Sequence, residues 1–139
     1  MTEPKIFNET IIDALRYHAL HSPDKPAYTF LNQTQKETLT YQGLLERVTG
    51  MAAHLSLSVA PGSRALLLLQ PGLDYIVSFL SCLMSGIIVI PMYPPRGNRH
   101  EKRLVSIIND AKASLVIATE AIQSSFDLLN VQWIFTDKE

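Results

Sequence analysis

A cluster of positive charge is the part of this sequence whose residue types could best bind a charged group. The segment carries four cationic side chains against one carboxylate, a local excess of three positive charges: Arg96, Arg99, Lys102, Arg103 and Glu101. Cations at the start of a helix are mildly unfavourable with its dipole. An anion held between arginines and the helix N-terminus would offset that cost. We therefore predict that Arg96 and Arg99 contact an anionic substrate or an acidic partner; the alternative is a solvated loop and helix face.

The position of this cluster supports the first interpretation. It follows the stretch GIIVIPMYPP, in which Ile87–Ile90 is predicted to be a central, buried strand. Pro91, Pro94 and Pro95 end that strand, because proline cannot donate to a β-ladder. The loop would therefore leave the carboxyl end of a parallel strand, where open α/β sheets bind their ligands.

Other chemically capable residues do not form a recognisable site. The sequence contains no G-x-G-x-x-G or G-x-x-x-x-G-K-[ST] phosphate loop and no G-x-S-x-G nucleophile motif. His18 and His21 lack acidic or cysteine partners at metal-binding spacing. Asp74 and Asp110 lie on predicted helices, where solvated or capping roles are expected. We predict no catalytic residue and no metal ligand in this chain.

The composition excludes several classes of protein. The chain has 139 residues, of which 47% are apolar, and a net charge of −1, which argues against a general nucleic-acid-binding protein. Cys82 is the single cysteine, so no internal disulfide can form, and its apolar surroundings predict a core position. The N-terminal residues lack the apolar core of a signal peptide, and no apolar run approaches the roughly 18 to 20 residues of a membrane span. We expect a cytoplasmic protein.

The first part of the chain predicts a helix, a hairpin and a second helix. Apolar residues recur at helical spacing from Phe7, with Asn8 as the expected N-cap. Ala27–Leu31 and Thr38–Thr40 are predicted to pair as a hairpin. Thr40 is then the expected cap of a helix that ends near Ser58.

From Arg64 onward, short apolar strands alternate with helical patterns. The predicted strands are Arg64–Gln70, Ile87–Pro91, Ser114–Thr119 and Val131–Thr136. The intervening helices show apolar faces, the last one through Ile122, Phe126 and Leu129, and Gly86 is the expected end of the first.

This order predicts an α/β fold: a βαβ series with a mostly parallel sheet covered by helices on both faces and right-handed crossovers. We expect one domain over residues 1–139, with Met1–Ser58 as a lead-in and Arg64–Glu139 as the βαβ unit. The predicted series stops at its last strand, which suggests part of something larger.

Two segments resemble core motifs of the AMP-forming adenylating enzymes. LTYQGLLERV (Leu39–Val48) resembles their first core motif, and LMSGIIVIPMYPP (Leu83–Pro95) resembles their second. The Tyr-Pro-Pro ending followed by arginines resembles the fatty acyl-AMP ligases in particular. The resemblance extends from about Phe7 to Phe135. Ser85 replaces the usual alanine, and Leu83 or Met84 stands where the general motif opens with lysine.

The resemblance implies an activity for a longer parent enzyme. Such an enzyme would activate a fatty acid with ATP and Mg²⁺ to acyl-AMP and pyrophosphate, and pass the acyl group to an acyl carrier protein. The family's phosphate loop, its adenine-, ribose- and magnesium-binding motifs and its catalytic lysine do not occur in this sequence. The resemblance therefore implies the first part of the large N-terminal domain, inactive alone and without bound cofactor.

Three alternatives remain open. The parent could be a fatty acid–CoA ligase, which shares the adenylation chemistry. The chain could instead be a non-catalytic interaction module that reuses this fold. An exposed apolar sheet edge would also allow the chain to self-associate.

Overall fold

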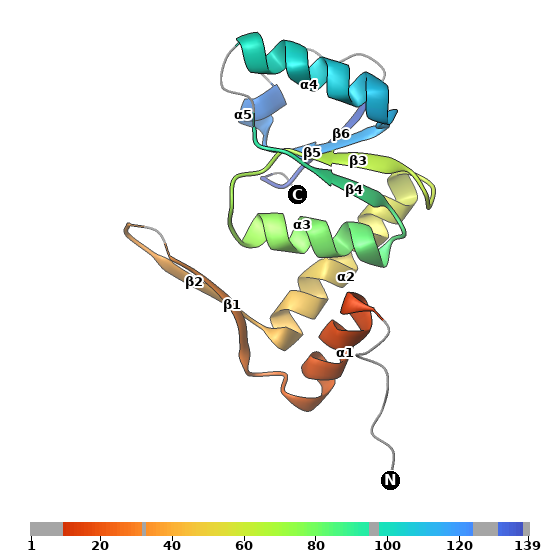
Figure 1. Ribbon diagram of the computed structural model, residues 1–139. Coiled ribbons are helices and arrows are strands. Elements are labelled where there is room, and N and C mark those ends of the chain that lie inside the picture. The colour runs from red at the N-terminus through yellow and green to blue at the C-terminus, as the bar shows by residue number, and fades with distance from the viewer. Residues whose placement is uncertain (1–9, 32, 95–97, 124–130, 138–139) are drawn as a thin grey trace.

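The computed structural model describes residues 10–31, 33–94, 98–123 and 131–137, and of residues 98–101 and 123 the backbone only. The chain folds into helices and a hairpin followed by an alternating series (Figure 1). The elements are α1 (Ile11–His21), β1 (Pro26–Leu31), β2 (Lys36–Thr40), α2 (Tyr41–Ser58), β3 (Arg64–Leu67), α3 (Leu73–Met84), β4 (Ile88–Pro91), α4 (Asn98–Ala111), β5 (Leu115–Ala118), α5 (Glu120–Gln123) and β6 (Gln132–Phe135).

The alternating series forms a four-stranded parallel sheet in the order β4-β3-β5-β6. β3 is the first of these four strands in the chain and lies between β4 and β5, so the strand order reverses beside it. Hydrogen bonds continue past the paired strands at the carboxyl edge: Leu68 N–H donates to the Ile117 carbonyl at 2.9 Å and Met92 N–H to the Leu67 carbonyl at 3.0 Å. The junction of β3 and β5 is therefore a topological switch point.

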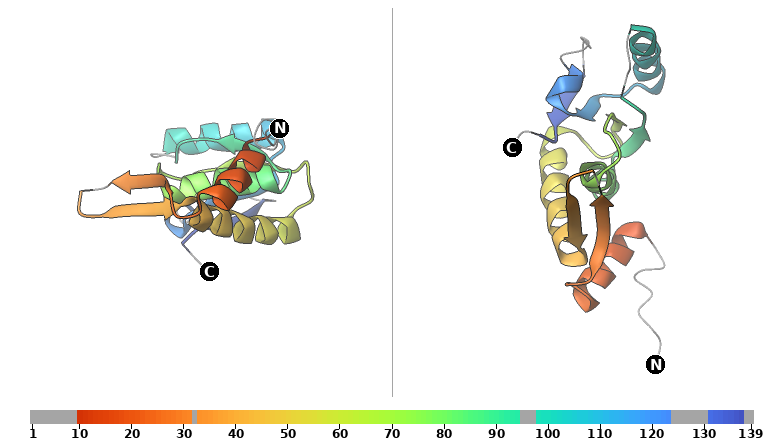
Figure 2. Two further views of the ribbon diagram at one scale, coloured as in Figure 1. Left: turned by 90° about the horizontal axis from the view of Figure 1, so that it is seen from below. Right: turned by 90° about the vertical axis from the view of Figure 1, so that its left-hand side faces the viewer.

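Helices cover both faces of this sheet, which confirms the predicted α/β architecture. α2 and α3 lie on one side and α4 on the other (Figures 1 and 2). The two central strands, β3 and β5, bury alternating residues on their two faces, as the strand period of two requires. Toward α2 and α3, β3 buries Ala65 and Leu67, and Leu69 continues this row just after the strand. The opposite core buries Leu66 and Leu68, together with Leu104 and Ile108 of α4.

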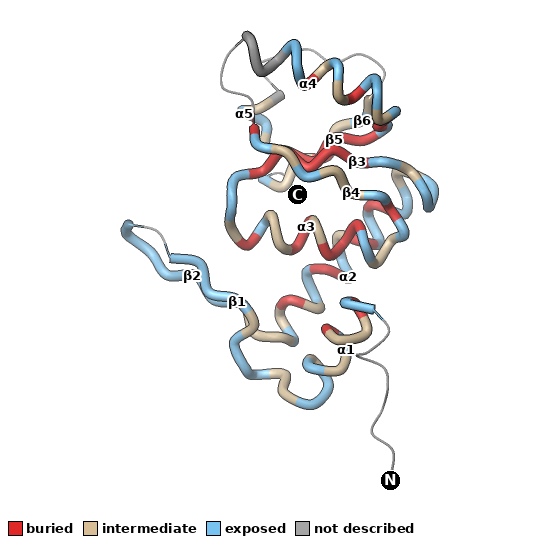
Figure 3. Tube along the Cα trace, viewed as in Figure 1, coloured by how far each residue is buried: buried red, intermediate tan, exposed pale blue. Residues whose placement is uncertain are grey.

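The prediction that Ile87–Ile90 forms a central buried strand is wrong. β4 lies at the edge of the sheet, and Ile88 is 50% exposed. The central positions belong to β3 and β5, because the chain places β4 on one side of β3 and returns past it to place β5 on the other. β5, in contrast, is buried along its whole length (Figure 3).

α3 packs against α2 through small polar side chains. Ser78 and Ser81 are completely buried. The Ser81 hydroxyl lies 2.6 Å from the Val77 carbonyl and 3.2 Å from the Val48 carbonyl of α2, and the Ser85 hydroxyl lies 3.1 Å from the Ala52 carbonyl. These bonds satisfy the hydroxyls and let the two helices approach closely. The nearly all-apolar sequence of α3 thus corresponds to a largely buried helix.

Capping side chains and left-handed residues fix the helix ends. Thr10 caps α1 by accepting a hydrogen bond from Asp13 N–H at 3.0 Å, so the expected cap at Asn8 is wrong; Thr40 caps α2 as predicted. After α3, Gly86 has φ +73° and the Ile87 N–H donates to the Cys82 carbonyl, which confirms its role as helix terminator.

The predicted hairpin is confirmed and projects from the body of the molecule (Figures 1 and 2). Most of its residues are exposed, including Tyr28 and Leu31 (Figure 3). At the other end of the chain, α5 contains part of the predicted last helix, since it includes Ile122. Phe126 and Leu129 lie outside the described residues.

Candidate functional site

The predicted anion-binding segment begins where the sequence places it, at the carboxyl end of β4. Pro94 is buried there. Arg96 lies outside the described residues, and Arg99 belongs to the first turn of α4, where only the backbone is described. Lys102 and Arg103 are exposed on α4. Contact of Arg96 and Arg99 with an anion therefore stays a prediction.

The structure also locates the other chemically capable residues. His18 stacks on Tyr41 with ring centroids 5.0 Å apart, and His21 packs against Tyr17 at 4.4 Å. Asp110 is exposed on α4, as predicted for a solvated role. Within the described part of the chain, no three His, Cys, Asp or Glu side chains lie close enough together to hold a metal ion.

Cys82 occupies the core position that the sequence predicts. It is completely buried in α3 between the helix pair and the sheet. Removal from water raises the pKa of its thiol from 9.0 to about 12, because burial disfavours the thiolate. A protonated, inaccessible thiol is not a nucleophile at neutral pH.

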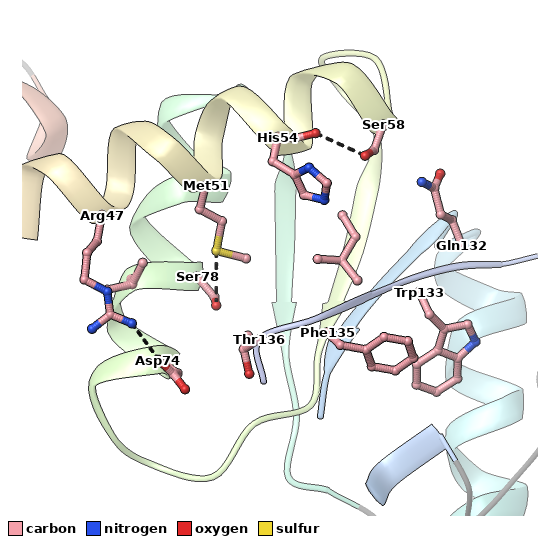
Figure 4. Close-up of a pocket in the computed structure, with 12 residues that line it drawn as sticks. Arg47, Met51, His54, Ser58, Asp74, Ser78, Gln132, Trp133, Phe135 and Thr136 are labelled. Carbon is pink, nitrogen blue, oxygen red and sulfur yellow. Dashed lines mark hydrogen bonds and ion pairs between the residues drawn. The ribbon is translucent and has the colours of Figure 1, made fainter. Parts of the chain in front are cut away.

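A pocket lies beside the edge strand β6, opposite α2 and α3 (Figure 4). Its volume is about 610 Å³. Arg47 from α2 and Asp74 from α3 form an ion pair at 2.8 Å at one end, and both side chains are about half exposed. His54 and Ser58 of α2 line the pocket on one side. On the other side, the rings of Trp133 and Phe135 of β6 stack on each other with centroids 6.1 Å apart. Asp74, for which a solvated or capping role is predicted, is thus half exposed and paired with Arg47.

A second pocket of about 300 Å³ lies at the carboxyl edge of the sheet, at the switch point between β3 and β5. Each of three strands is followed here by a polar side chain: Gln70 after β3, Thr119 after β5 and Thr136 after β6. The hairpin contributes Phe30, whose ring lies close to Gly72. Open α/β sheets bind ligands at this position, so the carboxyl-edge pocket is the candidate functional site.

Thr136 carries the one buried side-chain polar atom without a hydrogen-bond partner among the described residues, its hydroxyl oxygen. An unsatisfied buried polar group destabilises a fold by about 1–3 kcal/mol. Thr136 lines both the carboxyl-edge pocket and the larger pocket beside β6. The sequence analysis missed this residue because a threonine at a strand end carries no motif of its own.

The sequence is similar to a known protein family and to several of its members. The family model described as AMP-binding enzyme matches residues 15–134. The medium-chain-fatty-acid–[acyl-carrier-protein] ligase JamA of Moorena producens is 33% identical over 99% of this chain and 25% of its own length. A protein of Mycobacterium tuberculosis named as a fatty-acid–CoA ligase is 32% identical over 84% of this chain and 21% of its own length.

A solved structure agrees with the fold. The fatty acyl-adenylate ligase from L. pneumophila, crystallised in complex with acyl adenylate and pyrophosphate, superposes with a TM-score of 0.85 at 34% identity, over 96% of this chain and 25% of that chain. The chain thus spans about a fifth to a quarter of the length of these relatives. Among the described helices, none combines the length and apolar composition needed to cross a bilayer. The family model covers most of the sequence, so this chain belongs to the AMP-binding enzyme family, whose members are adenylate-forming enzymes.

Proposed function

We propose that this chain is the N-terminal part of a fatty acyl-AMP ligase, which activates a fatty acid with ATP. The observation that carries the proposal is the likeness, over 96% of the chain at 34% identity, to a ligase crystallised with acyl adenylate and pyrophosphate. The two sequence motifs at Leu39–Val48 and Leu83–Pro95 point the same way. The proposed organisation keeps Met1–Ser58 as a lead-in and Arg64–Glu139 as the βαβ unit.

The proposed reaction joins a fatty acid carboxylate to the α-phosphorus of ATP. The carboxylate oxygen forms a bond to that phosphorus, and the bond to the leaving pyrophosphate breaks. Mg²⁺, when bound, offsets phosphate charge. Among the described residues, no three His, Cys, Asp or Glu side chains lie close enough together to hold the metal.

This chain contributes to the proposed reaction by holding the carboxyl-edge pocket in place. The buried strands β3 and β5 hold the carboxyl-edge pocket, and the helices on both faces keep those strands in place. Positioning of reactants supplies a large part of many enzymatic rate enhancements. We propose no catalytic residue among the described side chains. The cytoplasm is the proposed compartment.

The acyl acceptor is proposed to be the phosphopantetheine thiol of an acyl carrier protein. The likeness to JamA, named as an acyl-carrier-protein ligase, supports this choice. Coenzyme A is the competing acceptor, supported by the relative named as a CoA ligase. Arg96 and Arg99 are proposed to contact the anionic substrate or the acidic carrier protein.

The test is to express the complete open reading frame that encodes this chain and supply it with fatty acids, ATP and Mg²⁺. Acyl-AMP is detected by mass spectrometry and pyrophosphate by a coupled assay. We expect both products, and acyl transfer to the carrier protein but not to coenzyme A. Transfer to coenzyme A alone would favour the CoA ligase. Carrier-protein binding without any adenylate would favour the interaction module and contradict the proposal.

The same protein tests the arginines. A variant with both Arg96→Ala and Arg99→Ala should bind the fatty acid or the carrier protein more weakly, while Lys36→Ala on the exposed hairpin serves as the matched charge control. Unchanged affinity in the double variant would exclude the anion contact.

A further inference from the structure

The hairpin has one edge that carries no charge. β1 has the sequence Pro-Ala-Tyr-Thr-Phe-Leu, whereas β2 carries Lys36 and Glu37, which are both exposed. Charged side chains on an edge strand discourage its pairing with another chain. In its sheet β1 pairs only with β2, so the second edge of β1 has no strand neighbour among the described residues. The β1 edge is therefore the side of the hairpin that can accept a further strand.

The same strand exposes aromatic side chains to water. Tyr28 is 44% exposed and Phe30 is 36% exposed, and the hairpin projects from the body of the molecule (Figures 1 and 2). These two side chains are two residues apart and therefore lie on the same face of the strand. A sheet of only two strands is marginally stable in water, and additional strands stabilise it. A further strand on the β1 edge would thus cover exposed apolar surface and stabilise the hairpin.

The chemistry of the β1 edge matches a second copy of itself. In an antiparallel pairing centred on Thr29, Tyr28 of each copy lies opposite Phe30 of the other copy, and the two Thr29 side chains face each other. Cross-strand aromatic pairs are favourable in antiparallel sheets. None of these pairs includes a charge, and the net charge of −1 leaves little repulsion between two copies. A second copy therefore fits this edge better than an acidic or basic peptide, which would find no charge to pair with.

We propose that two copies of this chain pair through their β1 edges and form a continuous four-stranded antiparallel sheet. The register shift between Pro26 and Tyr28 ends the pairing on one side, because such irregularities twist an edge away from a partner. The paired segment includes Phe30, which lines the carboxyl-edge pocket. The second copy thereby holds the hairpin wall of the candidate functional site in place. The proposal goes beyond the proposed function and does not rest on it, because dimer formation needs no substrate.

Sedimentation equilibrium of this chain over a range of protein concentrations tests the dimer. We expect the apparent mass to rise from 15.5 kDa at low concentration toward twice that value and no further, because the pairing uses both β1 edges. The amides of β1 should become better protected from hydrogen exchange over the same range. The amides of β5, which is buried along its whole length, should keep the same protection and serve as the internal control.

Charge variants at Thr29 test the register of the pairing. Thr29→Glu and Thr29→Lys each place two like charges opposite each other, so each should weaken dimer formation at least about tenfold. An equimolar mixture of these two variants should recover the affinity, because unlike charges then face each other. Thr38→Glu and Thr38→Lys are the matched controls, since they remove the same contact between the Thr29 and Thr38 hydroxyls, 3.1 Å apart, but alter the other strand. These controls should form dimers as the wild type does.

Three results with this chain would overturn the proposal. They are a mass of 15.5 kDa at every concentration, equal effects at Thr29 and Thr38, and a mixture of the two Thr29 variants that stays monomeric. The product of the complete open reading frame gives a fourth test. Protected β1 amides in a monomer would mean that a strand of the same polypeptide occupies the edge, and the proposal would fail. Adenylate formation is measured separately, so the proposed ligase activity does not depend on any of these results.

Discussion

The central strands of the sheet and the hairpin are both built from short strands, yet their environments are opposite. β3 and β5 lie between neighbouring strands and under helices on both faces, and Leu66, Leu115 and Val116 are completely buried. β1 and β2 pair only with each other in their sheet, and Leu31 is 69% exposed. The same strand conformation is thus stabilised by tertiary packing in one region and by one antiparallel partner in the other.

The carboxyl-edge pocket lies where these two regions meet. Gln70, Thr119 and Thr136 reach it from the segments that follow β3, β5 and β6, while the hairpin supplies Phe30 and Glu37. The Phe30 ring lies 3.9 Å from the position a Gly72 Cβ would occupy. A site built this way has a fixed floor and one wall that depends on a locally stabilised hairpin.

The largest predicted difference in stability comes from replacing one leucine in each region. Leu66→Ala in β3 should lower the free energy of unfolding by about 2–5 kcal/mol, since a cavity opens in a packed core. Leu31→Ala on the hairpin should change it by no more than about 0.5 kcal/mol. Urea unfolding followed by far-UV circular dichroism measures both. Similar losses from the two substitutions would show that the hairpin and the sheet are equally packed, and the comparison would fail.

How far the sequence predicts the structure also differs between the regions. Continuous apolar runs such as Leu115–Ala118 predict a buried parallel strand, and β5 confirms it. The same argument misplaces Ile88, because an apolar run does not state which strand reaches the edge. The site is harder to predict from the sequence. Thr136 and Gln70 line one pocket only because of the strand order β4-β3-β5-β6, which no local sequence pattern contains.

The ends of the covering helices also contribute to the stability of the sheet region, because the chain turns there to enter the next strand. Gly86 after α3 and Lys112 after α4 both have left-handed backbone, with φ +73° and +54°. Gly86→Ala should therefore lower the free energy of unfolding by about 1–2 kcal/mol, and Lys112→Gly should raise it by up to about 1 kcal/mol. Thermal unfolding of the two variants measures the opposite signs. A loss of stability in Lys112→Gly would mean that the lysine side chain itself holds the helix end.

Burial of Cys82 under the sheet predicts a pH dependence of the free energy of unfolding. Its folded pKa is raised from 9.0 to about 12, so its contribution to stability is complete below pH 9 and is lost as the pH rises toward 12. Relative to Cys82→Ala, the wild-type free energy of unfolding should fall by about 1 kcal/mol between pH 8.5 and pH 10. Denaturant unfolding at both pH values measures this difference, and tyrosine and lysine titration cancels in it. A constant difference would mean that the thiol has an ordinary pKa in the fold.

The smallest effect is expected inside the hairpin, from the Thr29 and Thr38 hydroxyls, which lie 3.1 Å apart across the two strands. Thr38→Ala should weaken the local pairing by about 0.2–1 kcal/mol, as for other cross-strand pairs. Amide hydrogen exchange should show faster exchange at the β1 and β2 amides, while the amides of β3 and β5 keep their protection, because the hairpin opens without unfolding the sheet. Thr29→Ala in the same background should add little, since the pair is already broken. Faster exchange in β3 as well would couple the hairpin to the sheet, and the wall at Phe30 would then be as rigid as the floor of the site.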